Sequence, residues 1–171
     1  MTGTTHIAYI GVGANLGDAA AQVRHAIDAL AALGLTRSSS LYRTEPLGEP
    51  DQPWYINAVV ELITELQPVA LLDALHRLEA AAGRRREPQA RPWQPRILDL
   101  DLLLFDDQVQ QGPGLRLPHP GFAERRFVLE PLAELAPEAR DPRSGCLVGR
   151  LLAELEDPLR VEKLPGYTNP G

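Results

Sequence analysis

Apolar and polar residues alternate along this chain with two periods, one typical of strands and the other of helices. Apolar runs predict strands at residues 7–12, 35–42, 55–64 and 97–105, with a shorter one at 115–117. Apolar residues at helical spacing predict helices over residues 19–33, from residue 68 to just before residue 83, and over roughly 147–156. Asp18 is placed to cap the first helix, Gly34 to stop it, and Pro68 to open the second.

The predicted order is strand, helix, strand, strand, helix, strand, followed by a C-terminal extension. This is the split βαβ, or ferredoxin-like (βαββαβ), pattern. We therefore expect an α+β domain, with an antiparallel sheet, helices packed on one face of it and a C-terminal helical extension. No repeat or linker divides the chain, so we expect one domain over residues 1–171, with a core at about 7–135 and the extension at 136–171. Residues 164–171 are expected to be a loose end.

Composition narrows the classes of function. The 171 residues carry a formal net charge of −6, which argues against a general nucleic-acid or membrane-surface binder. A single cysteine, Cys146, excludes a disulfide framework and a cysteine-rich zinc site. No apolar run approaches the roughly 20 residues of a membrane span, and the first residues lack the features of a signal peptide. We therefore expect a cytoplasmic protein that binds neither nucleic acid nor membrane, with a monomer as the default.

Two aspartates in the strand predicted at 97–105 are the strongest local signal. Residues two apart on a strand share one face at a spacing of about 6.6–6.8 Å, so Asp99 and Asp101 point the same way. The opposite, buried face is expected to be formed by Leu98, Leu100, Leu102 and Leu104. A bare D-x-D is more often a pair of surface acids, but so apolar a strand is expected to be central, where unpaired acids are rare. The pair therefore favours hard-cation binding, as in a Mg²⁺ or two-metal site.

An arginine-rich segment immediately precedes this strand in the sequence. Five arginines lie within thirteen residues and are opposed only by Glu87. They are Arg84, Arg85, Arg86, Arg91 and Arg96. A charge run is usually a solvated face. Beside two metal-binding carboxylates, however, guanidinium groups would neutralise phosphate oxygens that a metal does not reach. The two features together predict a site for a nucleotide and its metal.

Other polar and aromatic residues are candidates for ligand contacts. Tyr55 and Asn57 share a strand face, and an aromatic ring beside an amide suits a planar heterocycle. Trp93 in the arginine segment either caps the core or contacts a ligand. Glu79 lies on the second helix and faces the same site or water. His119, on a loop between two prolines, is either a donor to phosphate or an ordinary exposed histidine.

Several motifs together resemble one enzyme family. The segment W-x-P-R-x-x-D-L-D-L-L-L-F, residues 93–105, is similar to the signature of the 6-hydroxymethyl-7,8-dihydropterin pyrophosphokinases. Further segments agree in order: the opening strand and turn at 8–17, Y-R-T-E-P-L-G at 42–48, D-Q-P at 51–53, Y-x-N at 55–57, Glu79 followed by G-R-x-R at 83–86, L-P-H-P at 117–120 and R-R-F-V-L-x-P-L at 125–132. The resemblance covers about residues 7–135.

The resemblance implies an enzyme of folate biosynthesis that transfers pyrophosphate from ATP to the hydroxymethyl group of the dihydropterin and releases AMP. It implies two Mg²⁺ ions held by Asp99 and Asp101. The residues implied to bind the pterin are Gly13, Thr44, Leu47, Tyr55, Asn57, Trp93 and Phe127. Those implied to line ATP and its phosphates are Glu79, Arg86, Trp93, Arg96, His119 and Arg125. Arg86 and Arg96 would also be catalytic, because they would neutralise charge on the transferred group.

Two other classes stay open from the residues alone. Another Mg²⁺-dependent nucleotide transferase would also use D-x-D, but it would need a further substrate subdomain for which 171 residues leave little room. A non-catalytic ferredoxin-like binding module would not need two aspartates beside an arginine segment. The sequence departs from the family pattern at His76, Gly114 and Pro120, with Arg116 two residues beyond Gly114.

Overall fold

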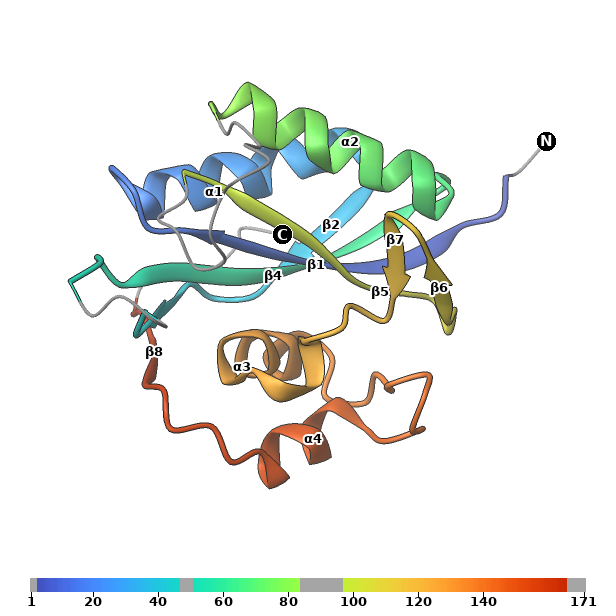
Figure 1. Cartoon of the computed structure of the whole chain (residues 1–171). Coiled ribbons are helices and arrows are strands. Elements are labelled where there is room, and N and C mark those ends of the chain that lie inside the picture. Colours follow the sequence, from blue (N-terminus) through green and yellow to red (C-terminus); the bar gives the residue numbers. More distant parts are fainter. Residues whose placement is uncertain (1–2, 47–50, 84–96, 166–171) are drawn as a thin grey trace.

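The structure of the 171-residue chain is a computed structural model, which describes residues 3–46, 51–83 and 97–165. Its main feature is a six-stranded antiparallel sheet (Figure 1). The strands run in the order β5 (Asp99–Phe105), β1 (His6–Ala14), β4 (Tyr55–Thr64), β3 (Tyr42–Thr44) and β8 (Val161–Lys163), while β2 (Leu35–Ser38) also pairs with β4. A separate hairpin joins β6 (Gln110–Gly112) to β7 (Leu115–Leu117).

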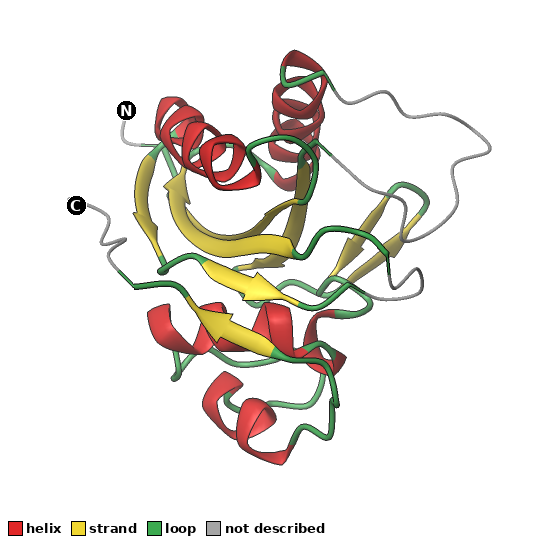
Figure 2. Cartoon of the chain, turned by 90° about the vertical axis from the view of Figure 1, so that its left-hand side faces the viewer, coloured by secondary structure: helices red, strands yellow, loops and turns green. Residues whose placement is uncertain are grey.

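The part of the chain that the structure describes holds four α-helices, and they cover both faces of the sheet (Figures 1 and 2). α1 (Ala19–Leu30) and α2 (Pro68–Ala81) lie on one face, and α3 (Arg126–Leu135) and α4 (Val148–Glu154) lie on the other. The prediction of an α+β chain with an antiparallel sheet is confirmed. The prediction of helices on one face is wrong, because the residues after position 125 form a second helical layer.

Each helical layer has its own apolar cluster against the sheet. The first includes Ile10, Leu62 and Leu75, and the second includes Val59, Leu103 and Leu132. Alternation along the strands accounts for this division, because neighbouring residues point to opposite faces. The sheet is therefore buried on both sides over much of its length.

Local signals in the sequence fix both ends of the first helical segment. The Asp18 carboxylate accepts from the Ala21 backbone N–H at 3.1 Å and so caps α1, as predicted. The last turn of this segment, Ala31–Leu33, tightens into a 3₁₀ helix. Gly34 follows, where an added Cβ would lie 2.0 Å from the Ile63 carbonyl oxygen. Only glycine lets the chain turn that close to β4.

Three elements of the second half, β6, α3 and β8, are absent from the sequence prediction. α3 contains Pro131, which lacks a backbone N–H and normally marks a helix end. Its buried stripe against the sheet is formed by Val128, Leu129, Leu132 and Leu135. β8 is only three residues long and comes from the part expected to be an extension. Because β8 pairs with β3, residues 161–163 belong to the main sheet.

The aspartate strand differs from its prediction in position and in alternation. Among the described strands, β5 stands at the end of the sheet order, not in its centre. It is apolar because it is covered on both faces. A β-bulge shifts the β1–β5 register between Tyr9 and Ile10. Beyond the bulge, Leu104 joins the second apolar cluster instead of the first, so it does not continue the face of Leu102.

Within the described ranges, no helix is long and apolar enough to cross a membrane.

Candidate active site

A cavity of about 290 Å³ lies on the α3 side of the sheet, where one end of β1 meets the starts of β4 and β5. Strands β1, β4 and β5 form its floor, and residues at the start of α3 form part of its wall. The predicted site residues that line it are Gly13, Thr44, Tyr55, Asn57, Asp99, Asp101, His119, Arg125 and Phe127. These residues are spread over more than a hundred positions in sequence, and antiparallel pairing brings them together.

The side chain of Asn57 is held by its neighbours on both adjacent strands. Its Nδ2 donates to Thr44 Oγ1 at 2.9 Å, and both residues are buried. On the other side Asn57 pairs with Gly13, where an added Cβ would lie 2.6 Å from Asn57 Oδ1. Gly13 therefore leaves room for the Asn57 amide, and the Thr44 hydroxyl accepts a hydrogen bond from it. Tyr55 lies on the same face of β4 at the cavity wall.

The two carboxylates face this cavity from β5. Asp99 and Asp101 are opposite Gly13 and Gly11 of β1, so small residues lie beside both acids. Within the described residues, no group of three or more His, Cys, Asp and Glu side chains is arranged to hold a metal ion. A cation here would take its protein ligands from two hard oxygen donors and fill its shell from water or phosphate, as Mg²⁺ does.

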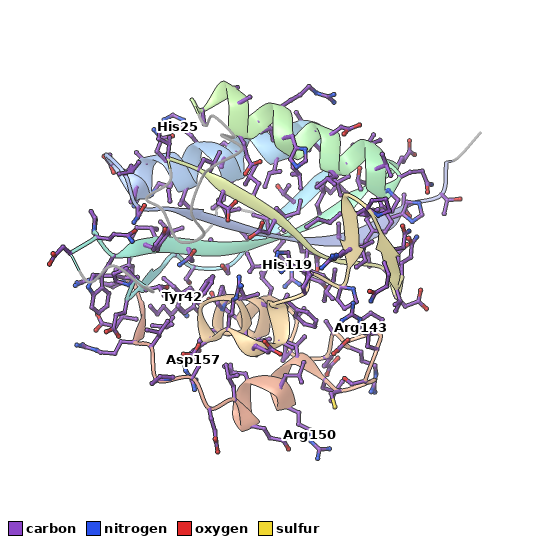
Figure 3. All side chains as sticks on the ribbon, viewed as in Figure 1. His25, Tyr42, His119, Arg143, Arg150 and Asp157 are labelled. Carbon is purple, nitrogen blue, oxygen red and sulfur yellow. The ribbon has the colours of Figure 1, made fainter. Side chains whose placement is uncertain are left out.

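His119 is anchored with one ring nitrogen toward the carboxylates. Its backbone N–H donates to the Leu103 carbonyl at 2.8 Å, and its Nδ1 accepts from the Gly121 N–H at 3.2 Å. Nε2 therefore carries the proton in the neutral ring, and it lies 3.9 Å from Asp101 Oδ1. Figure 3 shows His119 between the sheet and α3.

Burial is the main cause that lowers the pKa of His119 below its ordinary value of 6.5; the charge of Arg125 adds to this effect, and Asp99 opposes it. The ring is therefore neutral at pH 7 and presents an N–H donor to the cavity. His119 is half-buried and lines the cavity, and its role as a donor to phosphate stays a prediction.

Arg125 and Phe127 bring a cation and an aromatic ring from the start of α3. The Arg125 guanidinium carbon lies 5.9 Å from the centroid of the Phe127 ring. An added Cβ at Gly121 would lie 2.7 Å from that guanidinium carbon, so Gly121 makes room for the arginine. Both side chains line the same cavity as Tyr55.

Glu79 does not line the cavity in the structure. Its residue is 1% exposed, and its Oε2 accepts from the Leu100 backbone N–H at 3.0 Å. Leu100 lies between the two aspartates, so Glu79 ties α2 to the part of β5 that carries both acids. The Glu79 carboxylate therefore lies inside the core, and its expected contact with ATP stays a prediction.

Some predicted residues lie outside the part of the chain that the structure describes. These are Leu47, Arg86, Trp93 and Arg96, with the rest of the arginine segment. The departures from the family pattern are described: Gly114, with a φ of +86°, occupies the turn between β6 and β7, and Arg116 and Pro120 are exposed.

The cavity is also lined by residues that the sequence analysis did not identify as candidates. They include Gly11, Glu45, Val59, Leu103 and Val128. Strand alternation could have identified three of them. Gly11, Val59 and Leu103 lie two residues from predicted site residues and so share their strand face. Glu45 follows Thr44 directly, within the motif at 42–48.

A family model described as 7,8-dihydro-6-hydroxymethylpterin-pyrophosphokinase (HPPK) matches residues 9–137. This range includes every predicted site residue.

Curated relatives bear one common name, 2-amino-4-hydroxy-6-hydroxymethyldihydropteridine pyrophosphokinase. The protein from Pseudomonas aeruginosa is 44% identical over 162 residues, which cover 92% of this chain and 96% of the relative. The protein from Haemophilus influenzae is 38% identical over 161 residues, covering 92% and 98%. That from Bacillus subtilis is 43% identical over 133 residues, covering 76% and 78%.

Among solved structures, wild-type Plasmodium falciparum HPPK-DHPS with pteroate is similar in fold. The TM-score is 0.68 at 15% sequence identity, over 90% of this chain and 43% of that chain. This chain thus spans less than half of the length of that protein.

Proposed function

Since the chain belongs to the 7,8-dihydro-6-hydroxymethylpterin-pyrophosphokinase family, we propose that it transfers the diphosphate of ATP to the hydroxymethyl oxygen of 6-hydroxymethyl-7,8-dihydropterin and releases AMP. Its enzyme class is that of the ATP-dependent diphosphotransferases. The pterin diphosphate formed would serve folate biosynthesis. The observation that carries the proposal is one cavity that holds both the paired carboxylates and the aromatic and amide residues suited to a flat heterocycle.

The pterin would lie between Tyr55 and Phe127, with Asn57 on its amide edge. Tyr55 and Phe127 line the same cavity, and two aromatic rings can stack on the two faces of a flat ring. Asn57 is preorientated by Thr44, so its hydrogen-bonding groups are fixed before the ligand arrives. The family resemblance adds Leu47 and Trp93 to the pterin contacts.

ATP would approach the same cavity with its phosphates toward His119 and Arg125. The neutral His119 ring offers its Nε2–H, and Arg125 offers a positive charge near the developing charge of the transferred group. Arg86, Trp93 and Arg96 are assigned to ATP and its phosphates by the sequence motif alone. The position of Glu79 in the core supports a role in holding β5.

Asp99 and Asp101 would hold the Mg²⁺, with two ions as the family resemblance implies. When bound, Mg²⁺ would supply positive charge that stabilises the transferred phosphoryl group and would lower the pKa of the attacking hydroxyl. The protein's part is to place acceptor and donor in line and to exclude other geometries, which is the main requirement of phosphoryl-type transfer.

The strand order also supports a ferredoxin-like topology, if β2 and β3 are taken together as the second strand of the pattern. We propose a single pyrophosphokinase domain over 1–171, because β8 from the last part of the chain completes the sheet. The monomeric state and the cytoplasmic location stay predictions.

An AMP-release assay with ATP, Mg²⁺ and 6-hydroxymethyl-7,8-dihydropterin, with and without EDTA, tests the proposal. We expect AMP formation that depends on the pterin and is abolished by EDTA. AMP formation that ignores the pterin would favour another Mg²⁺-dependent nucleotide transferase. Binding of ATP and pterin without turnover would favour a non-catalytic module.

A further inference from the structure

The segment of residues 155–164, here termed the C-terminal strap, runs from α4 past the start of α3 to the outer edge of the sheet (Figure 1). It ends in β8, which pairs with β3. The start of α3 and the end of β3 are two walls of the cavity, carrying Phe127 and Thr44 respectively. The strap therefore touches both walls from outside.

At the first wall, the strap caps a helix that has no suitable cap of its own. The N-cap residue of α3 is Arg125, and an arginine side chain has no acceptor for a backbone N–H. Asp157 Oδ2 accepts from the Arg126 N–H at 3.0 Å, and Oδ1 accepts from Leu159 N–H at 3.0 Å. The Leu155 carbonyl also accepts from Arg126 Nη2 at 3.1 Å.

At the second wall, the strap is bonded to the chain beside Thr44. The Glu45 N–H donates to the Arg160 carbonyl at 3.0 Å, and the Arg160 N–H donates to Glu45 Oε2 at 3.0 Å. Val161 is opposite Thr44 in the ladder. The Arg160 guanidinium carbon lies 5.5 Å from the centroid of a Trp54 ring, which fixes the strap further.

We infer that Asp157 is a positioning residue for the heterocycle site, acting through the start of α3. Arg125 and Phe127, both at the cavity, flank Arg126, whose N–H donates to Asp157 Oδ2. A carboxylate at a helix start also interacts favourably with the helix dipole. The strap thereby sets the distance between the α3 wall and the β3 wall. This inference rests on the proposed pterin site.

The test compares Asp157→Ala and Asp157→Asn with Glu156→Ala in the full-length enzyme. Glu156 is an exposed acid next in sequence, so its removal matches the loss of charge without touching α3. The asparagine variant keeps an acceptor oxygen and similar size, so it serves if the alanine variant does not fold. Binding of the unreactive oxidised analogue 6-hydroxymethylpterin is measured by its fluorescence, and kcat and KM are measured for each substrate.

We expect Asp157→Ala to raise the pterin Kd and KM about fivefold to tenfold, with a smaller rise for Asp157→Asn and less than a twofold change for Glu156→Ala. The KM for ATP should change less than the KM for pterin. A lower kcat with unchanged pterin Kd would overturn the inference, because a merely structural role reduces only the active fraction. Equal effects of Asp157→Ala and Glu156→Ala would also overturn it. If the wild-type enzyme itself binds no pterin, the proposed function fails first, and the inference falls with it.

Discussion

At the scale of single residues, the two carboxylates of β5 lie on the same face of the strand. Asp99 and Asp101 line a cavity that Arg125 and His119 also line, and His119 Nε2 lies 3.9 Å from Asp101 Oδ1. Two carboxylates on one strand face offer the hard oxygen donors that suit a divalent cation.

Asp101→Asn should lower kcat by roughly a hundredfold to a thousandfold, because it removes one charged metal ligand and several kcal/mol of charge stabilisation. AMP release at saturating ATP, pterin and Mg²⁺ measures this. The matched control is Asp107→Asn, an exposed acid just after the same strand, which should leave kcat within twofold. Comparable kcat values for the two variants would refute the assignment of Asp101 to the metal.

Gly13→Ala should weaken pterin binding by about tenfold. The added Cβ would lie 2.6 Å from Asn57 Oδ1, so the amide must leave the position in which Thr44 holds it. A fluorescence titration with 6-hydroxymethylpterin provides the Kd. Gly112→Ala is the control, since its Cβ would meet its nearest atom at 3.8 Å. An unchanged Kd for Gly13→Ala would mean that Asn57 does not contact the pterin.

Much of the site could be predicted from the sequence, because strand alternation fixes which residues share a face. Tyr55 and Asn57, and separately Asp99 and Asp101, follow from this period alone. Glu79 shows what the sequence pattern alone cannot predict. Helical spacing places it on a polar face of α2, but only the tertiary fold shows that this carboxylate is buried and bonded to β5.

At the scale of elements, that contact joins α2 to the strand that carries both acids. Glu79→Ala should lower the free energy of unfolding by about 1–3 kcal/mol, since it leaves the Leu100 N–H without this acceptor. Glu79→Gln should lose less, because its amide oxygen can still accept. Urea denaturation of the two variants measures the difference. Equal losses would show that the hydrogen bond to Leu100 is not what stabilises the contact.

The sequence analysis did not predict α3 or β8, and each omission has a physical reason. α3 carries Pro131, and a proline usually ends a helix, yet the buried stripe of α3 against the sheet outweighs the missing bond. β8 has three residues, too few for a period to be visible, and it forms because β3 offers an open edge. In both cases packing with distant parts of the chain decides the local structure.

At the scale of the whole molecule, a cluster of polar groups ties α3 to the edge of the sheet. Glu134 on α3 accepts from the Tyr42 hydroxyl and from the Ser40 hydroxyl and backbone N–H. Lys163 on β8 lies 3.7 Å from the same carboxylate. Tyr42 lies on the α3 side of the sheet (Figure 3). The second helical layer, which carries part of the cavity wall, is thus held to the sheet by polar as well as apolar contacts.

This cluster predicts how stability depends on pH. Burial alone would raise the pKa of Glu134, but hydrogen bonds from Tyr42 and Ser40 and the charge of Lys163 outweigh it, so the pKa lies below its ordinary value of 4.5. The unfolded chain then binds more protons at this position, and the stabilisation is present above pH 4.5 and is lost as the pH falls through the folded-state pKa. Because Glu134 is an exposed residue and solvent screens its charge, Glu134→Gln should cost only about 0.5–1 kcal/mol at pH 7 and progressively less toward pH 3. Urea denaturation of wild type, Glu134→Gln and the exposed control Glu138→Gln across this range tests the prediction. A difference between wild type and Glu134→Gln that stays constant with pH would show that the carboxylate charge does not hold α3 to the sheet.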